Sequence, residues 1–271
     1  FRVTPRGRLE HVDLTGAVSL ESVEGKVRGA RATFDFAATG QPEKAHVEEE
    51  GVMERGDDVF HARSADFRFA PDGKFAGATL VGEPTGKVAI GRYLPPGERE
   101  LQAAHAELAG AGPLVVDFTN GTKLRFTGPG DFKVPEADLQ IHAERELTGE
   151  AAADHRSGRL GAEGAVVVHW KGDDLESETV QVTTSTTDAG DTIVAAQGSG
   201  LTILHRKKED GAAISVTALD GLSVRSSRAG LVVPVARGVT ISATGPKAFD
   251  ASADLVQDFD ELVVAIIKHT N

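Results

Sequence analysis

Apolar and polar residues alternate along most of this 271-residue chain. Val18 and Leu20 are separated by a single polar residue, and the same spacing recurs at Phe34 and Phe36 and in many later segments. Clusters of Gly, Pro or Asp interrupt the alternation about every 8 to 12 residues, which is typical of short antiparallel strands. The pattern predicts an all-β protein whose strands have one buried face and one wet face.

A hairpin is predicted between residues 114–118 and 124–126, where two alternating segments flank Asn120-Gly121. Asn and Gly tolerate the positive φ angles that a two-residue hairpin turn requires at both central positions. We therefore expect a tight turn at this dipeptide.

An internal repeat constrains the architecture more than any single motif. Residues 32–37 (ATFDFA) are followed by Gly40, and residues 65–70 (ADFRFA), which begin 33 positions later, are followed by Gly73. Each copy is expected to form a strand, a turn at the glycine, and a return strand. The repeat predicts a ladder of antiparallel hairpins.

The C-terminal segment has a different period. Leu255, Phe259, Leu262 and Ile266 recur at intervals of four, three and four residues, which predicts an amphipathic helix over residues 252–268. This helix is expected to cover an open end or edge of the sheet. Binding to a partner or to a membrane surface is the alternative.

The domain organisation has one candidate boundary, at Pro95, Pro96 and Gly97, because these residues do not sustain a central strand. We divide the chain into residues 1–92, residues 98–248 and residues 249–271. The middle segment is either a second β-rich unit or a continuation of the same elongated sheet, and the sequence favours neither.

Composition and charge exclude several functions. The chain has 29 basic and 41 acidic residues, a formal net charge of −12, which argues against nucleic acid as a partner. It has no cysteine, which excludes disulfides, thiolate metal sites and cysteine nucleophiles. None of the common hydrolase, phosphate-binding or metalloprotease motifs occurs. We therefore expect no catalytic residues, no metal and no cofactor.

No apolar run reaches the roughly 18 to 20 residues that a membrane-spanning helix needs. The chain begins with Phe1 rather than Met, so we expect that an upstream signal peptide or membrane anchor has been removed.

Several short glycine-based motifs resemble the OstA-like, lipopolysaccharide-transport periplasmic family. In that pattern a Gly-x-Val strand is followed by a strand of small and apolar residues, then by Gly-x-Pro-x-x-Ala and Gly-x-Val elements. The segments that carry the resemblance are residues 12–20 (VDLTGAVSL), 25–32 (GKVRGARA), 40–45 (GQPEKA), 50–52 (EGV), 60–67 (FHARSADF) and 80–84 (LVGEP). The resemblance covers residues 9–91 well, whereas the rest of the chain shares only the general pattern.

The resemblance implies an open β-jellyroll, or β-taco, that carries the acyl chains of lipopolysaccharide or another acylated lipid across the periplasm. Its partners would be other jellyroll transport proteins, joined by edge-strand or end-to-end stacking. The terminal helix would then block one edge. Eight apolar residues are expected to line the groove and bind lipid: Val18, Leu20, Phe34, Phe36, Val47, Phe67, Phe69 and Leu80.

Two other functional classes remain open from the residues alone. The same apolar positions would fill the closed core of a structural or adhesive β-rich envelope module. An enzyme that acts on carbohydrate would instead have a cleft with two close carboxylates.

Overall fold

The computed structural model describes residues 1–5, 7–22, 25–93, 102–153, 157–170, 172–186, 192–207, 213–227, 230–244 and 249–259. Within these ranges the protein is almost entirely antiparallel β-sheet, as the alternating pattern predicts, and its only helical element is a 3₁₀ turn, η1 (Pro135–Ala137).

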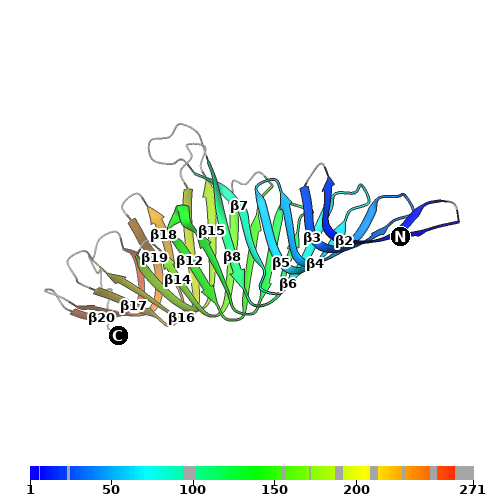
Figure 1. The fold of residues 1–271 in the computed structure, drawn as a ribbon. Coiled ribbons are helices and arrows are strands. Elements are labelled where there is room, and N and C mark those ends of the chain that lie inside the picture. The colour runs from blue at the N-terminus through cyan, green and yellow to red at the C-terminus, as the bar shows by residue number, and fades with distance from the viewer. Residues whose placement is uncertain are drawn as a thin grey trace.

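Within the described residues, twenty strands follow one another and belong to a single sheet. They are β1 (Arg2–Val3), β2 (Leu9–Ser22), β3 (Gly25–Phe36), β4 (Pro42–Arg55), β5 (Asp58–Phe69), β6 (Phe75–Val81), β7 (Thr85–Tyr93), β8 (Gln102–Gly110), β9 (Leu114–Asp117), β10 (Thr122–Thr127), β11 (Gly130–Val134), β12 (Leu139–Ala143), β13 (Glu146–Ala151), β14 (Ser157–Trp170), β15 (Asp173–Thr186), β16 (Thr192–Lys207), β17 (Ala213–Ala218), β18 (Leu222–Ser227), β19 (Gly230–Thr244) and β20 (Phe249–Phe259). The body is elongated, with β2 near one end and β20 near the other (Figure 1).

The sheet is folded along a line of β-bulges that we call the crease. The strand register shifts between Thr15 and Val18 in β2, and matching shifts lie opposite it in β3 and β4. In β4 the shift includes Glu49 and Glu50, both at positive φ, and β14 has its own shift with Ala165 at positive φ. Bulges bend a strand and increase its twist, so their alignment across neighbouring strands folds the whole sheet.

The crease separates two walls. Long strands such as β5 and β14 span both walls, whereas the short strands between them belong to one wall each. β5 pairs with β7 through residues 59–61 and with β6 through residues 64–69. The first wall continues through β7, β8, β11 and β12, and the second through β6, β9, β10 and β13, before both meet β14. Beyond β16, β17 continues the first wall and β18 the second.

The repeated hairpin unit is confirmed by identical turns. The N–H of Ala37 donates to the carbonyl of Gln41 over 2.9 Å, and the N–H of Ala70 donates to that of Lys74 over 2.8 Å. Gly40 and Gly73 close these turns at φ values of 85° and 83°.

A third copy of the same turn begins the chain and was missed from the sequence. The N–H of Thr4 donates to the carbonyl of Arg8 over 2.8 Å, and Gly7 has a φ of 77°. Gly7 precedes Gly40 by 33 residues, so the period holds for three turns. The available signal was Pro5-x-Gly7, which matches Pro71-x-Gly73.

The hairpin between β9 and β10 is confirmed, but the two-residue turn is wrong. Four residues connect the strands, and of the Asn120-Gly121 pair only Gly121 has a positive φ. The Asp117 carboxylate accepts hydrogen bonds from the N–H and hydroxyl of Thr119, which organises the wider turn and holds the pKa of Asp117 below its ordinary value.

The helix predicted over residues 252–268 is wrong where the structure describes this segment. Residues up to Phe259 form β20, which pairs with β19 in register. Leu255 and Phe259 are four residues apart, and an even spacing fits the period of a strand as well as that of a helix. Residues 260–268 lie outside the described residues.

The proposed boundary near residue 95 is flanked by paired strands. β7 and β8 pair from Thr85 opposite Ala109 to Tyr93 opposite Gln102, and both belong to the single sheet. Residues 94–101 lie outside the described residues, so the division at residues 92 and 98 stays a prediction.

Candidate functional site

The interior between the two walls is lined by apolar side chains that form unbroken rows across the strands. Each row consists of directly opposed residues on neighbouring strands, so it runs perpendicular to the strands and along the length of the body. The first wall carries one row: Val27, Met53, Phe60, Gly86, Leu108, Phe132, Ile141, Val168, Leu175, Leu204 and Val216.

The second wall carries two parallel rows. We call the edge of each wall that lies away from the crease its rim. The row nearer the rim contains Phe34, Ala45, Phe67, Ala78, Val116, Leu124, Gly149, Leu160, Val182 and Ala196. The row nearer the crease contains Ala32, Val47, Ala65, Leu80, Leu114, Phe126, Leu147, Ala162, Val180, Gly198 and Leu222. At a strand spacing of about 4.8 Å, ten strands extend such a row over roughly 43 Å.

All eight residues predicted to bind lipid face this interior. Val18, Phe34, Val47, Phe67, Phe69 and Leu80 are buried in one continuous core, and Leu20 and Phe36 pack against it while partly buried. The Phe67 and Phe75 rings meet edge to face with centroids 6.2 Å apart. The structure therefore brings the predicted set together, but in a packed core rather than along an exposed groove.

The predicted lipid-binding set omits most residues of the interior rows. Phe60, Phe132 and Ile141 are all buried, and each lies in an alternating segment of its strand. Phe126 lies in the alternating segment that predicts the hairpin, and it is buried as that pattern indicates. The alternation that identified Phe34 was the available signal. The alternation alone, however, does not show which face of the later strands points inward. That is decided by how the strands from β5 to β14 pair with one another.

One interior polar group lacks a partner. The Trp170 indole is buried, and its Nε1 has no hydrogen-bond partner in the part of the chain that the structure describes. Trp170 lies opposite Leu139 of β12, on the first wall. An indole N–H usually finds an acceptor when it is buried, so this donor is unusual.

The outer face carries three similar groups in which a histidine lies between two carboxylates. In the group on β4, Nδ1 of His46 lies 2.7 Å from the Asp66 carboxylate on β5, and Nε2 lies 3.3 Å from Glu48. The hydrogen bond with Asp66 raises the pKa of His46 above its ordinary value of 6.5. Burial opposes this shift, and Glu48 adds to it.

The other two groups repeat this geometry. His11 contacts Asp35 over 2.7 Å and Asp13 over 2.9 Å, and His142 contacts Asp131 over 3.1 Å and Glu144 over 3.4 Å. The pKa of His11 is raised chiefly by its hydrogen bond with Asp35, and that of His142 by its hydrogen bond with Asp131. In each group the two carboxylates favour the protonated, positively charged form of the histidine.

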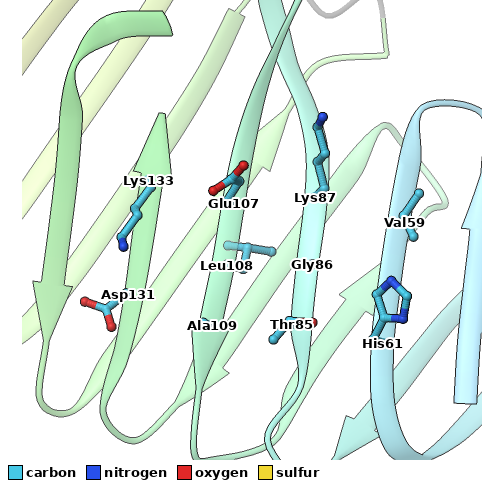
Figure 2. Close-up of a pocket in the computed structure, with 10 residues that line it drawn as sticks. All are labelled: Val59, His61, Thr85, Gly86, Lys87, Glu107, Leu108, Ala109, Asp131 and Lys133. Atoms are coloured by element: carbon cyan, nitrogen blue, oxygen red, sulfur yellow. The ribbon is translucent and has the colours of Figure 1, made fainter. Parts of the chain in front are cut away.

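A shallow hollow of about 480 Å³ lies on the outer face of the first wall (Figure 2). Lys87, Glu107 and Lys133 are directly opposed on β7, β8 and β11 and form one side of it. His61 and Asp131 lie along the other side. Lysines alternate with carboxylates here, so the hollow has no single charge that would define a ligand class.

A second hollow, of about 370 Å³, lies at the N-terminal end, where Phe36 adjoins Leu9 and Ala37. Arg8 borders it and donates from Nη1 to the carbonyl of Ala38 over 2.9 Å. Because Phe36 also packs against the interior core, the apolar interior comes close to the surface at this end.

The described ranges contain no group of three or more histidine or carboxylate side chains arranged to hold a metal ion. No helix within those ranges combines the length and apolar character needed to cross a bilayer.

These features define a class of protein: a long antiparallel sheet folded along a crease around a continuous apolar interior, with a charged outer surface. Comparisons of the chain with protein-family models, curated proteins and solved structures give no match.

Proposed function

We propose that this protein is a non-enzymatic lipid carrier or bridge component, which shields the acyl chains of lipopolysaccharide or another acylated lipid between its two walls. The observation that carries the proposal is the set of three uninterrupted apolar rows. Their length of roughly 43 Å is almost three times an acyl chain, taken as half of a 30 Å bilayer core. The core of a compact globular domain needs no apolar rows of this length.

The charge distribution supports an interior site. Apolar side chains face inward along the three rows, and most lysines, carboxylates and histidines occupy the alternate outward positions. The buried carboxylates of Asp58 and Asp173 lie outside these rows, where Asp58 binds Thr122 and Asp173 pairs with Arg206. Acyl chains gain about 25 cal/mol for each Å² removed from water. A charged lipid head group loses far more when it is buried, so the head group would remain outside the walls.

The ends of the sheet support stacking with other jellyroll proteins as the means of transfer. Within the described residues, β20 pairs only with β19, and β2 pairs with β1 only near its first residues. Unpaired strand edges recruit further strands from other chains. We place this assembly in the periplasm, where such a carrier would connect two membranes.

A structural or adhesive envelope module is the second candidate, and the packing of the interior favours it. Phe60, Phe67 and Leu80 are at most 1% exposed, as expected for a closed core that holds no ligand. A carrier must separate its walls to accept a lipid, whereas a structural module keeps them closed.

Native mass spectrometry of the gently purified protein, followed by extraction and identification of any copurified lipid, distinguishes the two. A photoreactive amino acid at Phe67 should then crosslink to acyl chains, while the same substitution at the outward-facing Arg68 should not. A lipid-free mass that persists after incubation with lipopolysaccharide would favour the structural module.

A further inference from the structure

The rims of the two walls meet along the middle of the body, on the side opposite the crease. A Cβ atom built on Gly25, at the rim of the first wall, would lie 3.3 Å from the Phe75 ring at the rim of the second. One built on Gly158 of the second wall would lie 3.4 Å from the carbonyl oxygen of Ile90 in the first. The two rims are therefore close together at both points, and side chains from both walls join them between these points.

We call the line along which the two rims meet the seam, and Asp58 is a buried polar residue in it. It is the first residue of β5, in the first wall, and is only 3% exposed. One carboxylate oxygen accepts a hydrogen bond from the N–H of Ala89 on β7 over 2.9 Å. The other accepts one from the hydroxyl of Thr122, on β10 of the second wall, over 3.2 Å. A buried carboxylate therefore bridges the two walls, with the hydroxyl of Thr122 as its partner on the second wall.

Phe118 supplies the apolar part of the seam. It follows β9 at the rim of the second wall and is 5% exposed. Its ring meets the Phe60 ring of the first wall edge to face, with centroids 6.3 Å apart. The guanidinium of Arg55, also from the first wall, lies 4.6 Å from the centroid of the Phe118 ring. A cation over an aromatic face is attracted by the ring.

A lipid inside the protein cannot coexist with this closed seam at the position of its head group. The head group stays in water while the acyl chains lie inside, so the linkage between them must pass between the rims. Movement of the lipid along the rows therefore requires the seam to open wherever the head group passes.

We propose that Asp58, Thr122, Phe118, Arg55 and Phe60 form a rim clasp, which controls entry of an acylated lipid into the interior and its passage along it. The inference rests on the proposed carrier function. The clasp suits a reversible gate, because opening returns the buried Asp58 carboxylate to water and so offsets part of the lost contacts.

A disulfide across the seam tests the clasp, because the natural chain has no cysteine. In the 271-residue double variant Asp58→Cys/Thr122→Cys, oxidation should lock the rims. Uptake of a fluorescent polyene fatty acid, which brightens in apolar surroundings, should then be at least ten times slower than in the reduced protein. Reductant should restore the rate.

The matched control is His11→Cys/Asp35→Cys, whose cysteines lie opposite each other on β2 and β3 within the second wall. Its oxidation should leave uptake unchanged. The single variant Thr122→Val removes the hydroxyl that joins Asp58 to the second wall, and should speed uptake about tenfold, the change expected from one hydrogen bond to a charged group.

The outcomes separate the two proposals. If wild-type and reduced proteins take up neither the fatty acid nor lipopolysaccharide, the carrier function is wrong. If they load normally, but locking the seam and Thr122→Val both leave the rate unchanged, the carrier function stands and the clasp is refuted.

Discussion

Replacing Phe67 with alanine measures how tightly the interior is packed. Phe67 is 1% exposed, and its opposed neighbours in the row are Ala45 and Ala78, whose methyl groups are too short to fill the space left behind. Phe→Ala substitutions in packed cores cost about 3–5 kcal/mol. The edge-to-face contact with Phe75 is also lost, and such pairs contribute about 0.5–1.5 kcal/mol. We therefore expect Phe67→Ala to lower the free energy of unfolding by about 4–5 kcal/mol.

Urea unfolding, followed both by far-ultraviolet circular dichroism and by the emission of the single tryptophan, gives this free energy. Phe1→Ala is the control, because Phe1 is 89% exposed and its loss should change stability by less than about 0.5 kcal/mol. A loss below about 1.5 kcal/mol for Phe67→Ala would refute the reasoning, because burial of the ring alone contributes at least that much. The walls would then stand apart in solution.

Three further substitutions test other features. Because Asp66 raises the pKa of His46, the stabilising contribution of the protonated His46 is complete below pH 6.5 and is lost as the pH rises through the folded-state pKa. The stability difference between wild type and His46→Gln, measured by thermal unfolding, should therefore shrink over that range. A difference that grows with pH would contradict the ion pair as the source of the stabilisation. Trp170→Phe should change the urea-derived stability by no more than about 1 kcal/mol, since it removes a buried donor without a partner, and a loss above about 3 kcal/mol would reveal an acceptor for the indole. Gly110→Ala should destabilise by about 1–3 kcal/mol, because the new Cβ would lie 2.2 Å from the Phe126 ring; the added change Phe126→Leu should recover part of the loss, and a neutral Gly110→Ala would show that the ring moves aside.

The features predictable from the sequence are those set by local patterns. The alternation around Phe34 and Phe67 predicted strands with the observed buried faces, and the glycines at 40 and 73 predicted two matching turns. The spacing of Leu255 and Phe259 led to a wrong helix prediction because it fits the period of a helix and that of a strand. The pairing of this segment with β19 selects the strand. Tertiary pairing overrides a weak local preference for helix.

The crease and the rim clasp were not predictable from one sequence. Positive φ at Glu49 and Glu50 follows no local signal, because glutamate disfavours that conformation, and it arises from bulges aligned across neighbouring strands. Asp58 and Thr122 are 64 positions apart and become neighbours only after the sheet folds over.

The turns at Gly7, Gly40 and Gly73 make the length of the body adjustable. Deleting residues 37–69 would join Phe36 to Ala70, two equivalent points of successive turns, and would place Phe36 opposite Phe75 as Phe69 now is. The shortened sheet would keep its cross-section and lose two strands, or about 10 Å of interior. Duplication or deletion of such units would change the length of the body in steps of one hairpin, without altering the packing of the interior that the remaining hairpins enclose.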